Sequence, residues 1–469
     1  MRSVAEALRN ALPFQPTTDQ AQLFGKLEEF MKAPDHSRSV FMLKGYAGTG
    51  KTTAVSALVK ILPEFGYQTV LMAPTGRAAK VMSLYSGKPA YTIHKKIYWQ
   101  TSNPYSEGLS FERQKNKQTK TVFIIDEASM ISDDKAFGEH GLLEDLVEYV
   151  FEKGSNRLLL VGDMAQLPPV GQALSPSLNP DYMRHTLHCD VSQIELKQVM
   201  RQGQESGILI NATNLRNELT NPAPQPAFST KPFRDIYRMT GERLEDGLRY
   251  AYNKFGTEDT VVICRSNKNA NLYNQHIRSQ IHFTESEIGV GDLIMIVKNN
   301  YFWLPKESGA GFLANGDFAE ITKIITFEEM YGFRFATVRL KLVDFPDVQE
   351  LDVKIILDTL HSPSPALPPA DNNKLYAEVL KDYEDLSTKK ERTAAVKANP
   401  YLNALQVKFA YAITCHKAQG GQWKAVFVDH GYLKDEPVND EFVRWLYTAV
   451  TRASEELFLV NFNPAFVTD

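Results

Sequence analysis

The sequence has little of what defines disulfide-stabilised, zinc-binding or membrane-spanning proteins. Its 469 residues include three cysteines, Cys189, Cys264 and Cys415, and no two of them form a CxxC pair. A disulfide framework or a zinc site is therefore not expected, and a reducing cytoplasm fits this composition. No stretch approaches the ~20 apolar residues of a membrane-spanning helix, and residues 1–14 lack the continuous apolar core of a signal peptide. We therefore expect a cytoplasmic protein without a membrane partner.

The chain also lacks a strong net charge of either sign. Its formal net charge is −4, whereas a protein that coats duplex DNA is usually strongly basic. With 43% hydrophobic and 23% charged residues, the composition is that of a globular protein with sizeable cores. The length allows two or three domains of ~100–200 residues. Lysine and arginine nevertheless gather in residues 76–121, which form either a solvated surface loop or a guide for phosphates.

Short apolar runs recur along the chain, each bounded by turn residues and followed by a helical pattern. Buried apolar strands that alternate with helices indicate parallel sheets built from βαβ units. The first series of runs lies at residues 40–43, 69–73, 122–125 and 158–161. The second series lies at residues 260–264, 409–413, 425–428 and 457–460. The sequence therefore predicts an α/β fold with two such domains in tandem.

Three segments interrupt this alternation. Residues 98–120 are polar and basic, and residues 221–232 are rich in proline, which is typical of a linker or surface crossing. Residues 286–403 contain alternating β-like runs at 293–297, 319–325 and 336–343, followed by a charged helical stretch at 375–397. We interpret this third segment as an inserted, small β-rich domain with a helical appendage.

A phosphate-binding loop is the most specific local signal. Residues 45–52 read GYAGTGKT, which matches GxxxxGK[ST] directly after a predicted strand and before a predicted helix. The glycines let backbone N–H groups and the helix N-terminus face an anion. Lys51 would reach the β- and γ-phosphates, and the Thr52 hydroxyl would hold Mg²⁺. The alternative, an ordinary glycine-rich turn, does not account for the lysine and threonine at these positions.

Two acidic residues and two arginines are candidates for hydrolysis chemistry. Asp126 and Glu127 follow the apolar run 122–125, where one carboxylate can bind Mg²⁺ through water and the next can polarise an attacking water. Arg201 and Arg452 could stabilise charge on the transferring phosphoryl group, since arginine fingers commonly act across a cleft. Taken singly, each arginine is as well explained by a surface ion pair.

Taken together, these strings resemble the superfamily 1 DNA helicases, subgroup B, the RecD-like group that includes the phage Dda helicase. The resemblance covers nearly the whole chain, and the motifs occur in the order of the family. They lie at residues 45–52 (motif I), 73–80 (Ia), 92–95 (Ib), 125–130 (II), 162–169 (III), 198–201 (IV), 414–420 (V) and 447–452 (VI).

The resemblance implies roles for individual residues at the nucleotide site. Gln20 would read adenine, and Gln166 would sense the γ-phosphate. Arg201 and Arg452 fall at the family's two finger positions and would complete the site when the cleft closes. The implied nucleotide contacts are Gln20, Gly48, Thr49, Gly50, Lys51, Thr52, Thr53 and Gly420, with Thr52 and Asp126 holding Mg²⁺ and ATP as the nucleotide.

The resemblance also implies a DNA path across both domains. Its expected contacts are Pro74, Thr75, Thr92, His94, Thr414 and His416, because hydroxyl and imidazole groups suit phosphates and sugars without reading sequence. His416 has a plain alternative as a packed or solvated histidine. Within residues 98–120, Trp99, Tyr105 or Phe111 would stack on the last base pair as a strand-separating pin, whereas the alternative is a hairpin whose aromatics pack on their own domain.

These expectations give a complete domain plan. Residues 1–97 and 121–200 would form a RecA-like ATP-binding domain, and residues 98–120 its hairpin insert. Residues 201–285 and 404–469 would form the second RecA-like domain, interrupted by an SH3-like insert at 286–403. Residues 299–303 of that insert could touch DNA or the pin, or could belong to its core.

The predicted function is ATP-driven movement on single-stranded DNA with unwinding of a duplex, 5′→3′ by resemblance alone. A translocase that displaces bound proteins with little unwinding remains the alternative, and a structural DNA-binding module without turnover is a third reading. Expected partners are single-stranded and fork DNA, with single-strand-binding, replication or repair proteins, for a monomer in a bacterial or phage-infected cell. A nuclease is disfavoured, because the ExK string at residues 195–197 has no metal-binding carboxylates beside it.

Overall fold

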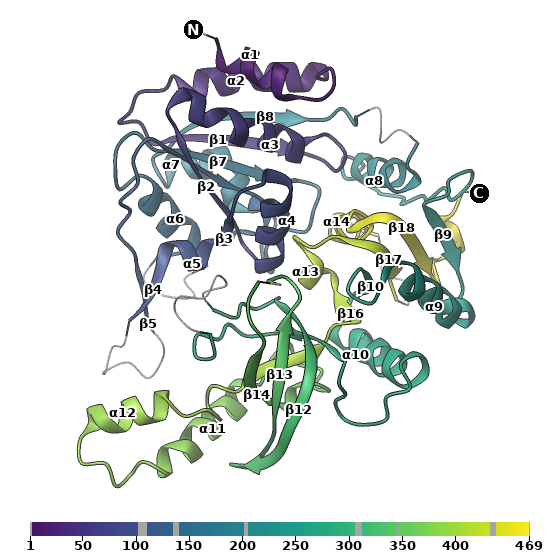
Figure 1. Ribbon diagram of the computed structural model, residues 1–469. Coiled ribbons are helices and arrows are strands. Elements are labelled where there is room, and N and C mark those ends of the chain that lie inside the picture. Colours follow the sequence, from purple (N-terminus) through teal and green to yellow (C-terminus); the bar gives the residue numbers. More distant parts are fainter. Residues whose placement is uncertain are drawn as a thin grey trace.

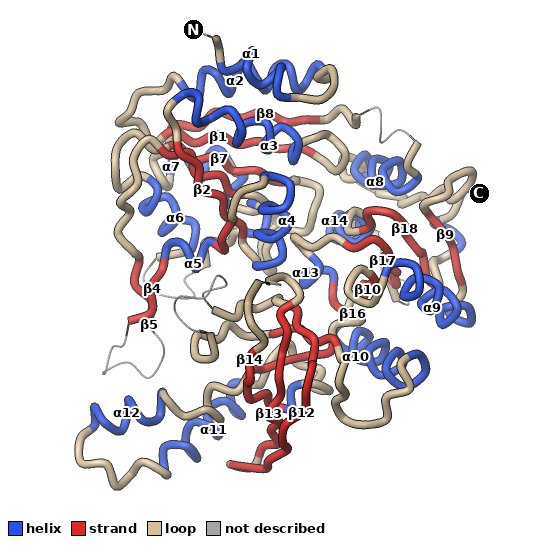
Figure 2. The backbone as a smooth tube through the Cα atoms, viewed as in Figure 1, coloured by secondary structure: helices blue, strands red, loops and turns tan. Residues whose placement is uncertain are grey.

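The computed structural model describes residues 2–101, 110–134, 140–200, 205–304, 312–345, 347–431 and 438–468, apart from the side chains of residues 100, 101, 110 and 111. Two parallel sheets lie side by side, and a closed barrel lies beneath the junction between them (Figure 1). Helices and strands alternate through both sheets, as Figure 2 shows. The predicted α/β class, with two parallel-sheet domains and a β-rich insert, is confirmed.

The first sheet has the strand order β3-β2-β6-β7-β1-β8, and its neighbouring strands pair in parallel. Its strands are β1 (Ser39–Gly45), β2 (Gln68–Ala73), β3 (Ala90–Thr92), β6 (Thr121–Ile125), β7 (Arg157–Gly162) and β8 (Asp190–Leu196). The helices around it are α1 (Val4–Ala11), α2 (Thr18–Met31), α3 (Lys51–Ile61), α4 (Gly76–Ser86), α5 (Ile93–Ile97), α6 (Leu142–Val150) and α7 (Pro180–His185).

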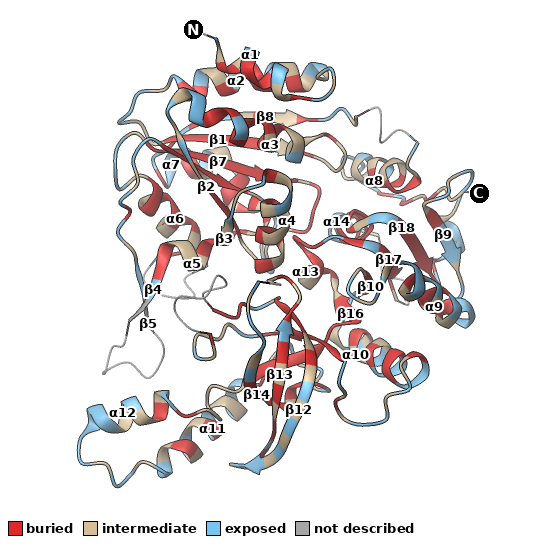
Figure 3. Ribbon diagram, in the orientation of Figure 1, coloured by how far each residue is buried: buried red, intermediate tan, exposed pale blue. Residues whose placement is uncertain are grey.

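Helices cover both faces of this sheet because side chains alternate along each strand. In β1, Phe41 and Leu43 pack in the cluster formed with α1, α2 and α3, whereas Val40 and Met42 pack in the cluster formed with α5 and α6. Figure 3 shows the resulting burial of the strands. The carboxyl ends of the strands remain open to the loops, which is where ligands bind in such sheets.

The second sheet has the order β16-β10-β17-β18-β9 and is also parallel. Its strands are β9 (Ile236–Met239), β10 (Thr260–Cys264), β16 (Ala412–Thr414), β17 (Trp423–Asp429) and β18 (Ala453–Val460). Its helices are α8 (Gly207–Glu218), α9 (Leu244–Phe255), α10 (Asn267–His276), α13 (Cys415–Ala418) and α14 (Asp440–Val450).

The β-rich insert is a closed barrel with an appendage of two helices (Figure 1). Its strands are β11 (Leu293–Ile296), β12 (Phe318–Met330), β13 (Phe333–Leu342), β14 (Leu351–Ile356) and β15 (Leu405–Phe409). Helices α11 (Pro369–Lys381) and α12 (Lys389–Lys397) lie between β14 and β15 in the chain. Leu375, Val379 and Val396 of these helices pack on Phe333 and Phe335 of the barrel.

Three boundaries differ from those predicted. The apolar run 409–413 is not one strand: β15 ends at Phe409 and β16 begins at Ala412. The barrel consequently extends past residue 403, where the sequence placed its end, because a continuous apolar run does not reveal which sheet pairs with each half. The charged stretch 375–397 is two helices, since a capping box at Thr388 and Glu391 begins α12 separately.

A short hairpin of β4 (Tyr98–Thr101) and β5 (Ser110–Arg113) lies within the predicted pin segment. Of the pin candidates, Tyr105 and the side chain of Phe111 lie outside the described residues, and Trp99 is 56% exposed on β4. Among the described helices, none is long and apolar enough to span a membrane. The three cysteines are free and buried.

Candidate functional site

The loop between β1 and α3 has the backbone of a phosphate-binding loop. Gly48 and Gly50 have positive φ angles of 73° and 83°, a region that favours glycine. A Cβ atom at Gly50 would lie 2.4 Å from Gln20 Nε2, so a larger residue does not fit there. Lys51 is the first residue of α3, and its Nζ donates to the carbonyl oxygens of Gly45 at 2.7 Å and Tyr46 at 2.9 Å.

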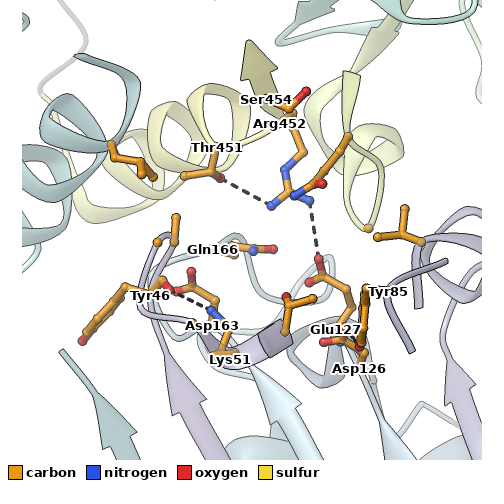
Figure 4. Close-up of a pocket in the computed structure, with 18 of the residues that line it drawn as sticks. Tyr46, Lys51, Tyr85, Asp126, Glu127, Asp163, Gln166, Thr451, Arg452 and Ser454 are labelled. Atoms are coloured by element: carbon orange, nitrogen blue, oxygen red, sulfur yellow. Dashed lines mark hydrogen bonds and ion pairs between the residues drawn. The ribbon is translucent and has the colours of Figure 1, made fainter. Parts of the chain in front are cut away.

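This loop lies at one wall of a cavity of about 900 Å³ between the two sheets. Figure 4 shows side chains from both domains pointing into it. The predicted site residues that line it are Gly48, Gly50, Lys51, Thr52, Thr53, Asp126, Glu127, Gln166, Gly420 and Arg452. Residues far apart in the sequence are thus brought to one place, although the role of each remains a prediction.

Two carboxylates follow β6 at the floor of the cavity. Asp126 accepts hydrogen bonds from the Tyr85 hydroxyl at 2.7 Å and from the Glu127 backbone N–H at 2.8 Å. Burial, and then the neighbouring Glu127 charge, raise the pKa of the Asp126 carboxyl. Glu127 has a φ of 51°, a rare conformation for a non-glycine residue that is often found at functional sites.

Arg452 crosses the cavity from the second domain. Its Nη1 lies 3.5 Å from Glu127 Oε1, and its Nε donates to Thr448 O at 3.1 Å. Arg452 is 3% exposed, so this cation is held inside the protein opposite the phosphate-binding loop. The other predicted finger, Arg201, lies outside the described residues.

Further contacts across the cavity were not singled out from the sequence. The Tyr447 hydroxyl donates to Asp163 Oδ2 at 2.7 Å and accepts from Ala47 N–H at 2.9 Å. Leu167 N–H donates to Thr448 Oγ1 at 2.8 Å. Burial raises the pKa of the Asp163 carboxyl. Asp163 and Tyr447 lie within motifs III and VI, which could have marked them as site residues. No local pattern indicated that Tyr85 would contact Asp126.

Gln166 and Gln20 occupy different positions relative to the cavity. Gln166 lines it, and its Oε1 has no hydrogen-bond partner within the described part of the chain. Gln20 is buried behind the loop: its Oε1 accepts from Thr17 N–H at 3.1 Å in a capping box, and its Nε2 donates to Thr49 O at 3.4 Å. Like Thr49, Gln20 is not part of the cavity wall, and adenine recognition by it stays a prediction.

The residues expected to contact DNA lie at helix starts. The Thr75 and Thr92 hydroxyls cap α4 and α5 by accepting from Ala78 N–H at 3.2 Å and Lys95 N–H at 3.3 Å. Thr414 is the N-cap residue of α13. The Thr75 and Thr92 hydroxyls would therefore share their oxygen between a backbone N–H and a phosphate, whereas the Thr414 hydroxyl makes no capping hydrogen bond to α13.

Pro74 and the two histidines complete the expected set. Pro74 is half-buried between β2 and α4. Burial lowers the pKa of His94 to about 4 and lowers the pKa of His416 as well. Both imidazoles are therefore neutral near pH 7 and could donate one N–H to a phosphate or sugar without adding charge.

Oxygen donors suited to Mg²⁺ meet at the same cavity. The Thr52 side chain is exposed at the start of α3, and the Asp126 carboxylate lies on the same wall. Hydroxyl and carboxylate oxygens are the ligands that Mg²⁺ prefers. Among the described residues, no group of three or more His, Cys, Asp or Glu could hold a metal ion.

Comparison with known proteins gives two family matches. Residues 27–224 match the AAA domain, and residues 409–460 match the UvrD-like helicase C-terminal domain. An uncharacterized protein of Acanthamoeba polyphaga mimivirus is 23% identical, over 94% of this chain and 98% of its own length. The ATP-dependent DNA helicase dda of Enterobacteria phage T4 is 29% identical, over 57% of this chain and 58% of its own.

A third relative is longer. The ATP-dependent RecD2 DNA helicase of Deinococcus radiodurans is 24% identical over 89% of this chain but 46% of its own length. The chain thus spans about half the length of the two helicases named here. The two family matches cover the phosphate-binding loop and Arg452 respectively.

Proposed function

The chain is a superfamily 1 helicase homologue of the RecD-like subgroup, and from this premise we propose that it hydrolyses ATP between its two α/β domains to move along single-stranded DNA. The observation that carries this proposal is the cavity in which Lys51 and Glu127 face Arg452. Cation, carboxylate and phosphate-binding loop are the groups that phosphoryl transfer to water requires.

Each residue at the cavity would have a distinct task. The phosphates would replace the Gly45 and Tyr46 carbonyls as acceptors for Lys51 Nζ. Glu127 would take the proton of the attacking water, and Arg452 would leave Glu127 for the γ-phosphate. Gln166, whose Oε1 has no hydrogen-bond partner among the described residues, would accept a hydrogen bond from that water. Thr52 and Asp126 would hold Mg²⁺, which neutralises phosphate charge when bound.

Hydrolysis would be coupled to movement through the domain interface. Because Arg452 and Tyr447 come from the second domain, their contacts with Glu127, Asp163 and Ala47 would be lost if the cleft opened. ATP that binds the closed state more tightly shifts the equilibrium toward closure, and hydrolysis releases it.

The DNA path proposed here runs along Pro74, Thr75, Thr92, His94, Thr414 and His416, with Trp99 as the pin. The direction proposed is 5′→3′, and the active form proposed is a monomer on single-stranded or fork DNA. The proposed domain bounds are those set out above, with the end of the barrel moved from residue 403 to Phe409.

An unwinding assay on duplexes with a 5′ or a 3′ single-stranded tail tests the proposal. We expect ATP hydrolysis that rises with single-stranded DNA and unwinding from the 5′ tail, with Lys51→Ala inactive in both assays. Unwinding from the 3′ tail alone would contradict the direction. If DNA-stimulated hydrolysis removed a bound protein from single-stranded DNA but did not unwind a duplex, the protein would be a translocase and not a helicase.

A further inference from the structure

Arg77 of α4 lies at the junction of the first domain, the second domain and the barrel. Its guanidinium carbon lies 4.0 Å from the centroid of the Trp423 ring and 4.6 Å from that of the Phe318 ring. Trp423 begins β17 of the second sheet, and Phe318 begins β12 of the barrel. One cationic side chain of the first domain is thus enclosed by two buried rings from the other two parts of the molecule.

The two rings are the main partners of this guanidinium. Its Nη2 makes a long hydrogen bond of 3.5 Å to Gln422 O, and its buried Nη1 has no hydrogen-bond partner among the residues that the structure describes. A planar guanidinium stacks on aromatic faces. A shift of either ring would therefore require Arg77 to move, and a shift of Arg77 would require the rings to move.

Arg77 is connected to the nucleotide cavity through Gly421. A Cβ atom at Gly421 would lie 2.5 Å from the Trp423 ring and 3.0 Å from Arg77 Cδ, so backbone, ring and arginine are in close contact. Gly421 O accepts a hydrogen bond from Arg452 Nη1 at 3.3 Å, and Trp423 N–H donates to Arg452 O at 3.0 Å. Arg452 Nη1 in turn lies 3.5 Å from Glu127.

The other end of this series of contacts lies at the start of α4. Thr75, a proposed DNA contact, is the N-cap residue of α4, two positions before Arg77. A Cβ atom at Gly420 would lie 3.1 Å from Thr75 Oγ1. Lys80 of the same helix donates to Val343 O of the barrel at 2.7 Å. If bound single-stranded DNA displaced α4 slightly, the helix would therefore press on both the second domain and the barrel.

We propose that Arg77 is a positioning residue that couples DNA contact at the start of α4 to the placement of Arg452 at the nucleotide. The coupling runs through Trp423 and Gly421, which are packed too closely to move independently. The inference rests on the proposed function, since it concerns how single-stranded DNA stimulates ATP hydrolysis. Arg77 itself is not among the residues that line the nucleotide cavity.

Steady-state ATPase measurements on Arg77→Met and Arg77→Lys test the proposal. Methionine keeps the apolar length but removes the cation and its plane, whereas lysine keeps the apolar length and the charge and loses only the planar guanidinium. We expect Arg77→Met to lower the DNA-stimulated kcat by about threefold to thirtyfold, the range of a coupling residue. The KM for ATP and the half-saturating concentration of oligo-dT should change by less than about twofold, since no ligand contact is lost. Arg77→Lys should lie between Arg77→Met and wild type.

Two further variants keep the result interpretable. Arg339→Met removes a barrel arginine that pairs with Asp352 on the surface, and should behave as wild type. Phe318→Leu removes one ring from the barrel side and should lower kcat with the same unchanged KM, even if Arg77→Met folds poorly.

The outcomes separate the two proposals. Absence of DNA-stimulated hydrolysis in the wild type would overturn the proposed function. Wild-type stimulation that persists fully in Arg77→Met and Phe318→Leu would overturn the coupling alone. A proportionate loss of oligo-dT affinity would show that Arg77 is a DNA contact and would also overturn the positioning role.

Discussion

Arg452 of the second domain lies 3.5 Å, Nη1 to Oε1, from Glu127 of the first. The two side chains come from the ends of different sheets and are 4% and 20% exposed. Because the pair is so little exposed, removing one of the two charges leaves the other poorly solvated and destabilises the folded protein. Under the proposed function, a phosphate of ATP would take the place of the Glu127 carboxylate beside Arg452.

Glu127→Gln should bind ATP but hydrolyse it slowly. The amide keeps the shape of the side chain, but it loses the charge that pairs with Arg452 and cannot take a proton from water. We expect kcat to fall by about 10²-fold or more, the usual contribution of a general base, while ATP affinity in a fluorescent-nucleotide titration stays within a few-fold. Glu148→Gln, on the outer surface of α6 beside Arg38, is the matched control. Wild-type turnover in Glu127→Gln would contradict its role.

Arg452→Ala should lose turnover and keep most nucleotide affinity. An arginine finger acts on charge that develops in the transition state, and its removal costs about 10³-fold or more in kcat. The substitution also leaves Glu127 without its cation and Gly421 O without a donor. Melting temperatures should therefore be measured beside the ATPase rate. Unchanged DNA-stimulated ATPase in a folded Arg452→Ala protein would remove Arg452 from the mechanism.

The phosphate-binding loop and the two sheets were predictable because their signals are local. The glycines of residues 45–52, an apolar run before them and a helical pattern after them specify strand, loop and helix. The carboxyl ends of parallel strands meet at one edge of a sheet, and β1 and β6 accordingly bring Lys51 and Asp126 to the same cavity.

Contacts between the domains were not predictable from local patterns. Nothing in residues 447–452 shows by spacing that Arg452 reaches Glu127, and the resemblance placed Arg452 only at the γ-phosphate. The hydrogen bond from Tyr85 to Asp126 and the stacking of Arg77 depend on how whole domains pack. The run 409–413 was misassigned for the same reason, since β15 pairs with barrel strands and β16 with β10.

The thermal stability of the protein should depend on pH through Asp317. Burial raises the pKa of this carboxyl from 3.8 to about 8, and nearby Asp344 adds to the rise. The folded state therefore binds a proton that the unfolded state has lost between about pH 4 and pH 8, so stability falls as pH rises through that window. Asp317→Asn carries no such proton. Between pH 6 and pH 8, its melting temperature should therefore fall less than that of the wild type.

The control for that experiment is Asp352→Asn in the same barrel. Asp352 is exposed and pairs with Arg339, and surface pairs contribute little. Its melting temperature should follow the wild-type pH dependence. If Asp317→Asn and wild type showed parallel curves, the Asp317 carboxyl would not hold a proton in the folded state, which would contradict the prediction.

Trp99→Ala should uncouple unwinding from ATP hydrolysis. The indole is 56% exposed on β4, at the start of the hairpin, and one aromatic–base stack is worth roughly 1–3 kcal/mol. Opening a base-pair step costs roughly 1.4 kcal/mol, so loss of the stack should slow unwinding of a tailed duplex severalfold while DNA-stimulated ATPase stays near wild type. Phe327→Ala, which removes an equally exposed ring from the far end of β12, is the control. Equal unwinding by Trp99→Ala and wild type would assign the pin to another residue, whereas a parallel fall in ATPase would place Trp99 on the translocation path instead.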